Sequence, residues 1–184
     1  PPASIGGAMA TMLAWGPSIA PNDLELYFCS PGLGGYGNND IWVTTRPTVD
    51  DAWGPPANLG QAINSPYEDL DPTISPDGLL LFFDSRDDSD RWGTYVTRRT
   101  TKSDPWGPRT YLGSILNPPG EIGTERPGGV SFDGSMLYVF CNQRRTIWQV
   151  PILPVVDFSG DGMVDAADLG LLEANWGKNA PLCD

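Results

Sequence analysis

The residues best suited to chemistry lie near the C-terminus, in the segment DFSGDGMVDAADLGLLEANWGKN. Its oxygen-bearing residues fall on positions 1, 3, 5, 7, 9 and 12 of a calcium-binding loop, and Gly162 stands at position 6, where such a loop bends sharply. These candidate ligands are Asp157, Ser159, Asp161, Met163 through its backbone carbonyl, Asp165 and Asp168. Alternate residues of a tightly wound loop turn their oxygens inward, so the spacing predicts a calcium site.

The elements that would position this loop differ on its two sides. After the loop, Leu169, Leu172 and Trp176 recur at helical spacing, which predicts an amphipathic helix over 166–175 that ends before Gly177. Before the loop, PILPVVDF shows no helical period and predicts a strand or an extended linker. The competing interpretation is an acidic turn in front of an unrelated helix.

Composition excludes several kinds of chemistry. The 184 residues contain no histidine, which removes Ser-His-Asp and Cys-His catalysis and histidine-based zinc or iron sites. With 23 acidic against 11 basic residues the formal net charge is −12, so binding to nucleic acid is not expected. Cys29, Cys141 and Cys183 have no CxxC spacing, and no apolar run is long enough to span a bilayer. A hard, oxygen-preferring cation such as calcium is the metal that suits this composition.

Residues 1–152 consist of about three copies of one unit. The segments APNDLELYFCS, SPDGLLLFFDS and SFDGSMLYVFC align at offsets of 55 and 56, and NDIWVTTR, WGTYVTRR and RTIWQVPI align at offsets of 53. Alternation of apolar and polar residues is typical of strands, so each unit predicts a four-stranded antiparallel meander. The fold class expected is therefore mainly β, with about three blades of a partial propeller near 16–64, 71–117 and 127–152.

Two kinds of repeated position have structural explanations. Asn22, Asp77 and Asp133 follow Pro or Phe at equivalent places and predict tight hairpin turns capped by the side chain. The aromatic positions predict packing between blades rather than ligand platforms. They are Trp53 and Trp106 in one column, and Trp42, Tyr95 and Trp148 in the other.

On these motifs, SPDGLLLFFDS and SPGLGGYGNNDIWVTTR resemble TolB-type, WD-like β-propeller repeats of bacterial envelope and secreted proteins. The segment 157–176, a calcium loop followed by one helix with aspartate at position 12, is similar to a dockerin repeat. The resemblance implies the same six calcium ligands. The ending NWGKNAPLCD resembles dockerin-like tails of planctomycete-type secreted proteins. Together these imply a propeller over 1–152, a linker at 153–156 and a dockerin-like, EF-hand-type repeat over 157–184.

The chain departs from both patterns. Propellers have four to eight blades, so about three blades predict a segment of a longer protein or, as the alternative, copies that assemble into a ring. Dockerins carry two repeats, and those of clostridia place Ser-Thr-like residues where Ala166 and Ala167 stand here. The expected protein partner is therefore a second dockerin repeat, with a cohesin-like protein disfavoured.

Three further groups were weighed as sites. The charged cluster of Asp84, Arg86, Asp87, Asp88, Asp90 and Arg91 is expected to be a solvated hairpin tip, with a second calcium as the alternative. The carboxylates Glu68, Asp69, Asp71, Glu121 and Glu125 are not brought together by any pattern, so no catalytic residue is predicted. Sugar-stacking candidates are Trp15, Tyr36 and Trp92.

The sequence therefore predicts a non-catalytic, secreted or cell-surface bacterial protein, in which a propeller offers a binding surface and a calcium-ordered module contacts protein or polysaccharide. The alternative is a fragment of a polysaccharide-degrading enzyme, a glycoside hydrolase or lyase, whose catalytic residues lie outside this chain. Dockerin-like modules commonly tether enzymes of that kind.

Overall fold

A computed structural model describes residues 11–89, 91–112, 116, 125–141 and 145–152. The chain divides into two compact units, Pro1–Val150 and Pro151–Asp184. The first unit holds the sheets described below. The linker, the calcium ligands and the helix predicted at 153–184 all lie outside the described residues.

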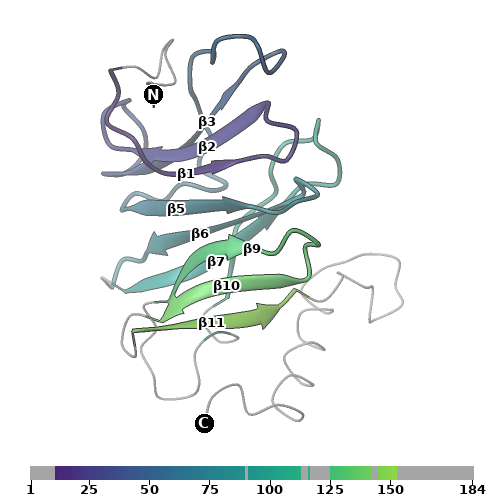
Figure 1. The fold of residues 1–184 in the computed structure, drawn as a ribbon. Helices are drawn as coiled ribbons and strands as arrows, with labels where there is room; N and C mark the ends of the chain where they lie inside the picture. The colour runs from purple at the N-terminus through teal and green to yellow at the C-terminus, as the bar shows by residue number, and fades with distance from the viewer. Residues whose placement is uncertain (1–10, 90, 113–115, 117–124, 142–144, 153–184) are drawn as a thin grey trace. The chain divides into compact units, whose positions relative to one another are not determined.

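The described strands form three antiparallel sheets, each built from strands that follow one another in sequence. Figure 1 shows them from purple through teal to green. Sheet 1 contains β1 (Trp15–Ile19), β2 (Glu25–Ser30), β3 (Asp40–Thr45) and β4 (Ala57–Asn58). Sheet 2 contains β5 (Asp69–Ile74), β6 (Leu80–Arg86), β7 (Trp92–Arg98) and β8 (Thr110–Tyr111). Sheet 3 contains β9 (Glu125–Val130), β10 (Met136–Cys141) and β11 (Thr146–Pro151). The predicted mainly β class is confirmed, with three rather than four strands described in sheet 3.

The first hairpin of each sheet is closed by the predicted column of turn residues. The backbone N–H two residues further on donates to the side-chain oxygen of Asn22 (3.1 Å), Asp77 (2.9 Å) and Asp133 (3.0 Å). Gly78 and Gly134 take φ values of 73° and 74°, which glycine adopts at little cost. In sheet 1 the position equivalent to Gly78 and Gly134 is Asp23, which has a φ of 57°. The turn prediction is confirmed.

The two faces of each sheet carry different sets of residues. The front face of sheet 1 is defined as the side on which Leu26, Phe28, Trp42 and Trp53 lie. These four residues form one buried cluster, and Met12 and Leu33 pack against it. The back face of sheet 1 is the opposite side, on which Tyr27, Ile41 and Val43 lie. Equivalent residues of sheets 2 and 3 take the same names, because the internal repeat preserves the alternation of the strands.

The back face of sheet 1 packs against the front face of sheet 2. Tyr27 and Ile41 share one core cluster with Leu81 and Phe83, while Tyr95 and Trp106 are packed against it; Ile63 and Ile74 complete the cluster. The rings of Tyr27 and Trp106 meet in a T-shaped arrangement, with a centroid distance of 6.1 Å. The prediction that the aromatic columns pack between blades is thus confirmed for this pair of sheets.

An arginine clamp repeats in sheets 1 and 2. The guanidinium carbon of Arg46 lies 4.4 Å from the Trp53 ring centroid, and that of Arg99 lies 4.5 Å from Trp106. Each Nε donates to the carbonyl of the hairpin turn, at Asp23 (2.7 Å) or Gly78 (2.8 Å). The clamp joins the turn between the first two strands of a sheet to the Trp-Gly-Pro segment that precedes its last strand. The same interaction therefore stabilises the same end of sheets 1 and 2.

Candidate binding groove

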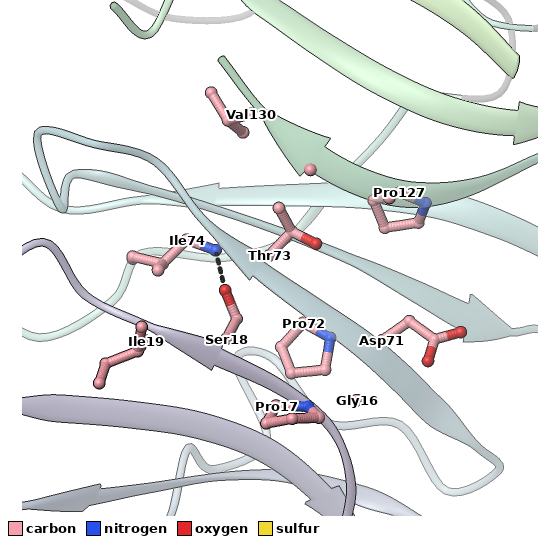
Figure 2. A pocket seen from close by; sticks show the side chains of 12 residues that line it. Gly16, Pro17, Ser18, Ile19, Asp71, Pro72, Thr73, Ile74, Pro127 and Val130 are labelled. Carbon is pink, nitrogen blue, oxygen red and sulfur yellow. Dashed lines mark hydrogen bonds between the residues drawn. The ribbon is translucent and has the colours of Figure 1, made fainter. Parts of the chain in front are cut away.

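The first strands of the three sheets lie side by side and form a groove. β1, β5 and β9 each stand at the edge of their own sheet, and β5 contacts both of the others. Figure 2 shows the groove, which has a volume of about 480 Å³. It is lined by residues 16–19, 71–74 and 127–130. Concave surfaces at the junction of several elements are the usual place for a binding site.

Repeated prolines and bulges shape the walls of this groove. Pro17, Pro72 and Pro127 recur at intervals of 55, and each edge strand shifts its register beside the proline. Proline lacks an N–H and bulges bend the strand, so these edges are protected against pairing with another strand. At Gly16, φ is 59° and an added Cβ would lie 3.1 Å from Asp71 Oδ1, so the close approach of β1 to β5 needs glycine there.

The polar groups of the groove are largely engaged. Ser18 Oγ accepts a hydrogen bond from the backbone N–H of Ile74 (3.1 Å), which ties β1 to β5 (Figure 2). Asp71 is the only ionisable residue among the twelve that line the groove. Its Oδ2 lies 3.4 Å from Arg126 Nη1, and Arg126 Nε lies 3.4 Å from Asp84 Oδ2. The wall is therefore apolar and hydroxyl-bearing, with its one charge compensated.

Three of the candidate carboxylates, Glu68, Asp69 and Asp71, lie in ion pairs, and the side chain of Glu125 is outside the described part of the chain. Glu68 pairs with Arg86 (3.1 Å), and Asp69 lies 3.3 Å from Arg109 Nη1. Burial raises the pKa of the Asp69 carboxyl, while hydrogen bonds from Ser85 and Ser65 act in the opposite direction. The Ser65 backbone N–H donates to Asp69 at 2.6 Å, so this acid anchors the connection between sheets 1 and 2. Glu121 lies outside the described residues.

Asp87, Asp88 and Arg91 of the charged cluster lie at the tip of the hairpin between β6 and β7, whereas Asp90 lies outside the described residues. Asp87 accepts from the backbone N–H of Ser89 and of Arg91 and from Arg91 Nε, each at 2.9 Å. These bonds, with that of the Arg91 backbone first, lower the pKa of Asp87. Asp84 is not part of the hairpin tip, because it is fully buried on the back face of sheet 2. Among the residues that the structure describes, no group of three or more Asp, Glu or Cys side chains is placed to hold a metal ion.

The stacking candidates and Cys29 lie in different environments. Trp15 and Tyr36 are 41% and 47% exposed, whereas Trp92 is half-buried with the guanidinium of Arg126 over its ring. Cys29 is a free cysteine whose thiol donates to the Trp15 carbonyl (3.2 Å). Burial raises the pKa of this thiol to about 11, so it stays protonated and unreactive at neutral pH.

Sequence reasoning missed the groove. The proline column at intervals of 55 was visible in the alignment of the repeats, and it marks the inner strand of each unit. Arg126, which compensates Asp71 and Asp84, carried no such signal because it has no counterpart in the other two units.

Antiparallel sheets of three or four strands joined face to back define a mainly β protein of the β-propeller kind. Among solved structures, the chain is similar to TolB from Acinetobacter baumannii, with a TM-score of 0.50 and 13% identity over 84% of this chain. It covers 32% of that protein, so it spans about a third of its length. At this identity the likeness shows the fold alone.

No protein-family model and no curated protein matches the chain. Within the described part of the chain, no helix is long and apolar enough to cross a membrane.

Proposed function

We propose that this chain is a non-catalytic binding module of an extracellular or cell-surface protein, and that the groove along β1, β5 and β9 receives an uncharged segment of a protein partner. The observation that carries the proposal is the groove itself, lined by proline, glycine, hydroxyl and aliphatic groups with its one carboxylate compensated. Such a wall favours shape and apolar contact over recognition of a charged ligand.

Rigidity supports a binding role. The groove crosses three sheets, and β1 and β5 are joined by the Ser18–Ile74 hydrogen bond. The proline-bearing strands that line the groove are already ordered before a ligand binds. The entropic cost of binding is therefore lower. The acids beside the groove lie in ion pairs, as Asp69 does with Arg109, which supports structural roles for them.

Binding at the groove is tested by selecting displayed short peptides against the chain and comparing two arginine variants. Val130→Arg fills the groove, whereas Val49→Arg places the same side chain at a position that is 53% exposed and outside it. We expect the selected peptides to lose at least about tenfold in affinity for the first variant and to bind the second normally. Peptides that bind both variants equally, or no selected peptide at all, would contradict the proposal.

The second part of the proposal is a calcium-binding module. Asp157, Ser159, Asp161, the Met163 carbonyl, Asp165 and Asp168 would hold the ion. The ordered loop would then let its dockerin-like helix dock on a second repeat or a cohesin-like partner. Calcium concentrations outside cells suit a weak site of this kind, because extracellular modules operate near ~10⁻⁴–10⁻³ M.

Calcium titration by calorimetry on the full chain tests that part independently. We expect saturable binding that disappears in the double variant Asp157→Ala/Asp161→Ala. An Asp88→Ala variant, altered at the exposed hairpin tip of sheet 2, is the matched control and should bind normally. Absence of binding at millimolar calcium would remove the module and leave the groove proposal standing.

The alternative function is the sugar-binding part of a polysaccharide-degrading enzyme whose catalytic residues lie outside this chain. It is favoured by the exposure of Trp15 and Tyr36, since Trp15 begins β1 and the loop of Tyr36 leaves β2 at the same end of sheet 1. Retardation of the chain by soluble polysaccharide in affinity electrophoresis, lost in Trp15→Ala and kept in Val49→Ala, would establish this alternative.

A further inference from the structure

Within the part of the chain that the structure describes, nothing packs over the back face of sheet 3, which is an apolar surface. Tyr138 and Phe140 alternate along β10, and each is 39% exposed. Ile147 on the neighbouring β11 is 74% exposed. By contrast, Leu137 and Val139 on the front face of the same sheet are 2% and 0% exposed. One side of sheet 3 is therefore packed as a core while the other faces solvent with aromatic and aliphatic groups.

The internal repeat shows that this surface is normally covered. Tyr138 takes the position of Tyr27 and Phe82, which are 1% and 4% exposed. At the position of Ile147, sheets 1 and 2 carry Ile41 and Thr94, which are 0% and 1% exposed. The pairs Cys29–Ile41 and Asp84–Thr94 lie side by side across β2–β3 and β6–β7, so Phe140 and Ile147 share one face of sheet 3. The same surface is buried in two sheets and exposed in the third.

The chain also shows what kind of surface covers a back face. Behind sheet 1, the covering residues are the front-face residues Leu81 and Phe83, with Tyr95 and Trp106 packed around them. The front face of sheet 1 is similarly apolar and aromatic. At the four equivalent positions of the repeat it has Leu26, Phe28, Trp42 and Trp53. Among the described residues, Met12 and Leu33 pack against this face, and both are partly buried side chains that belong to no strand.

We propose that the back face of sheet 3 binds the front face of sheet 1 of a second copy of this chain, with Met12 and Leu33 displaced at the contact. The contact would reproduce, between two molecules, the packing that joins sheets 1 and 2 within one molecule. It is head-to-tail, so two copies joined through both contacts close on themselves. Two copies would bring together six of the sheets that the structure describes, three from each, and six lies within the four to eight of closed propellers.

The oligomeric state of the full chain tests this contact. We expect sedimentation velocity to detect a dimer at micromolar concentrations, and Ile147→Lys to raise its dissociation constant by at least about tenfold. Ile147 is mostly exposed, so this variant should keep the circular dichroism of the parent chain. Phe132→Lys is the matched control, because Phe132 is 99% exposed in the hairpin turn and lies outside the face. A monomer at about 100 µM, or a dimer that Ile147→Lys leaves unchanged, would overturn the proposal.

The direction of the contact is tested by disulfide cross-linking. Ile147→Cys and Leu26→Cys proteins, mixed under mild oxidation, should form a mixed disulfide, because Ile41 and Leu81 hold the equivalent positions in the cluster between sheets 1 and 2. Neither protein should link to itself above the background of the parent chain. Efficient self-linking of Ile147→Cys would instead indicate two back faces in contact, which contradicts the head-to-tail arrangement.

Discussion

The junction between sheets 1 and 2 is held by an apolar cluster, whereas the junction between sheets 2 and 3 contains buried charge. Tyr27, Ile41 and Phe83 are each at most 1% exposed in the first junction. In the second, Asp84 is 0% exposed and faces Arg126 of sheet 3 at 3.4 Å. The same repeat can thus join its sheets either by apolar area or by an ion pair.

The difference between the two junctions follows from the residues at two repeated positions of the back face. Where the back face of sheet 1 has Cys29 and Ile41, that of sheet 2 has Asp84 and Thr94, and the Thr94 hydroxyl donates to Asp84 at 3.5 Å. An apolar junction tolerates small shifts, because the hydrophobic effect is non-directional. A buried carboxylate needs a cation at a fixed place, so the second junction depends on Arg126.

The largest expected effect comes from breaking the apolar junction. Phe83→Ala removes a fully buried ring from the cluster and should lower the free energy of unfolding by about 3–5 kcal/mol. Urea denaturation measures this loss, and the fully exposed Phe132→Ala should change it by less than about 0.5 kcal/mol. Equal effects of the two substitutions would mean that the junction is not a core.

A smaller effect is expected from breaking the charged junction. Arg126→Leu removes the guanidinium that lies 3.4 Å from the buried Asp84 carboxylate and should cost about 1–3 kcal/mol, reduced because the arginine side chain is 41% exposed. Adding Asp84→Asn should recover part of that loss, since the buried charge is then gone. Strictly additive losses in the double variant would show that the pair does not couple the sheets.

The two arginine clamps differ in what they hold together. Arg99 also donates from Nη2 to Glu25 of sheet 1 (2.8 Å) and its side chain is only 6% exposed, so it ties the apolar junction as well as its own sheet. We expect Arg99→Ala to cost about 2 kcal/mol and Arg46→Ala about 1 kcal/mol in thermal or urea unfolding. Glu25→Gln should remove most of the difference between them; a difference that persists would place its cause elsewhere.

The smallest effects concern pH. Burial raises the folded-state pKa of Asp69, so its contribution to stability is fully present below about pH 4 and is lost as the pH rises through that pKa. Asp133 behaves oppositely, because hydrogen bonds from Ser131 and Ser135 lower its pKa to about 2. Its contribution is present above about pH 4 and is lost as the pH falls toward 2.

Unfolding measured against pH therefore distinguishes these two acids. Relative to Asp69→Asn, the parent chain should gain stability between neutral pH and about pH 4. Relative to Asp133→Asn, it should lose stability between about pH 4 and 2. Slopes of the same sign for both comparisons would contradict the assignment of burial at one acid and turn capping at the other.

Much of the fold followed from local signals. The strands, the turns at Asn22, Asp77 and Asp133 and the packing of Tyr95 and Trp106 between two sheets were predictable. Alternation and turn chemistry act over a few residues, and the aromatic columns recur in the repeat. The groove was not predicted, since its walls come from strands that are 55 residues apart and touch only through the packing of the sheets. The calcium ligands at 157–168 remain a prediction from spacing.

The sequence by itself determined the mainly β class, the repeated unit and its hairpin turns, because these depend on residue types at short, regular spacing. The tertiary structure was needed to place Asp69, Asp71 and Asp84 beside Arg109 and Arg126, and to show that no described residue packs over the back face of sheet 3. The physical reason is that ion pairing and burial depend on which faces meet, and partners distant in sequence set that meeting.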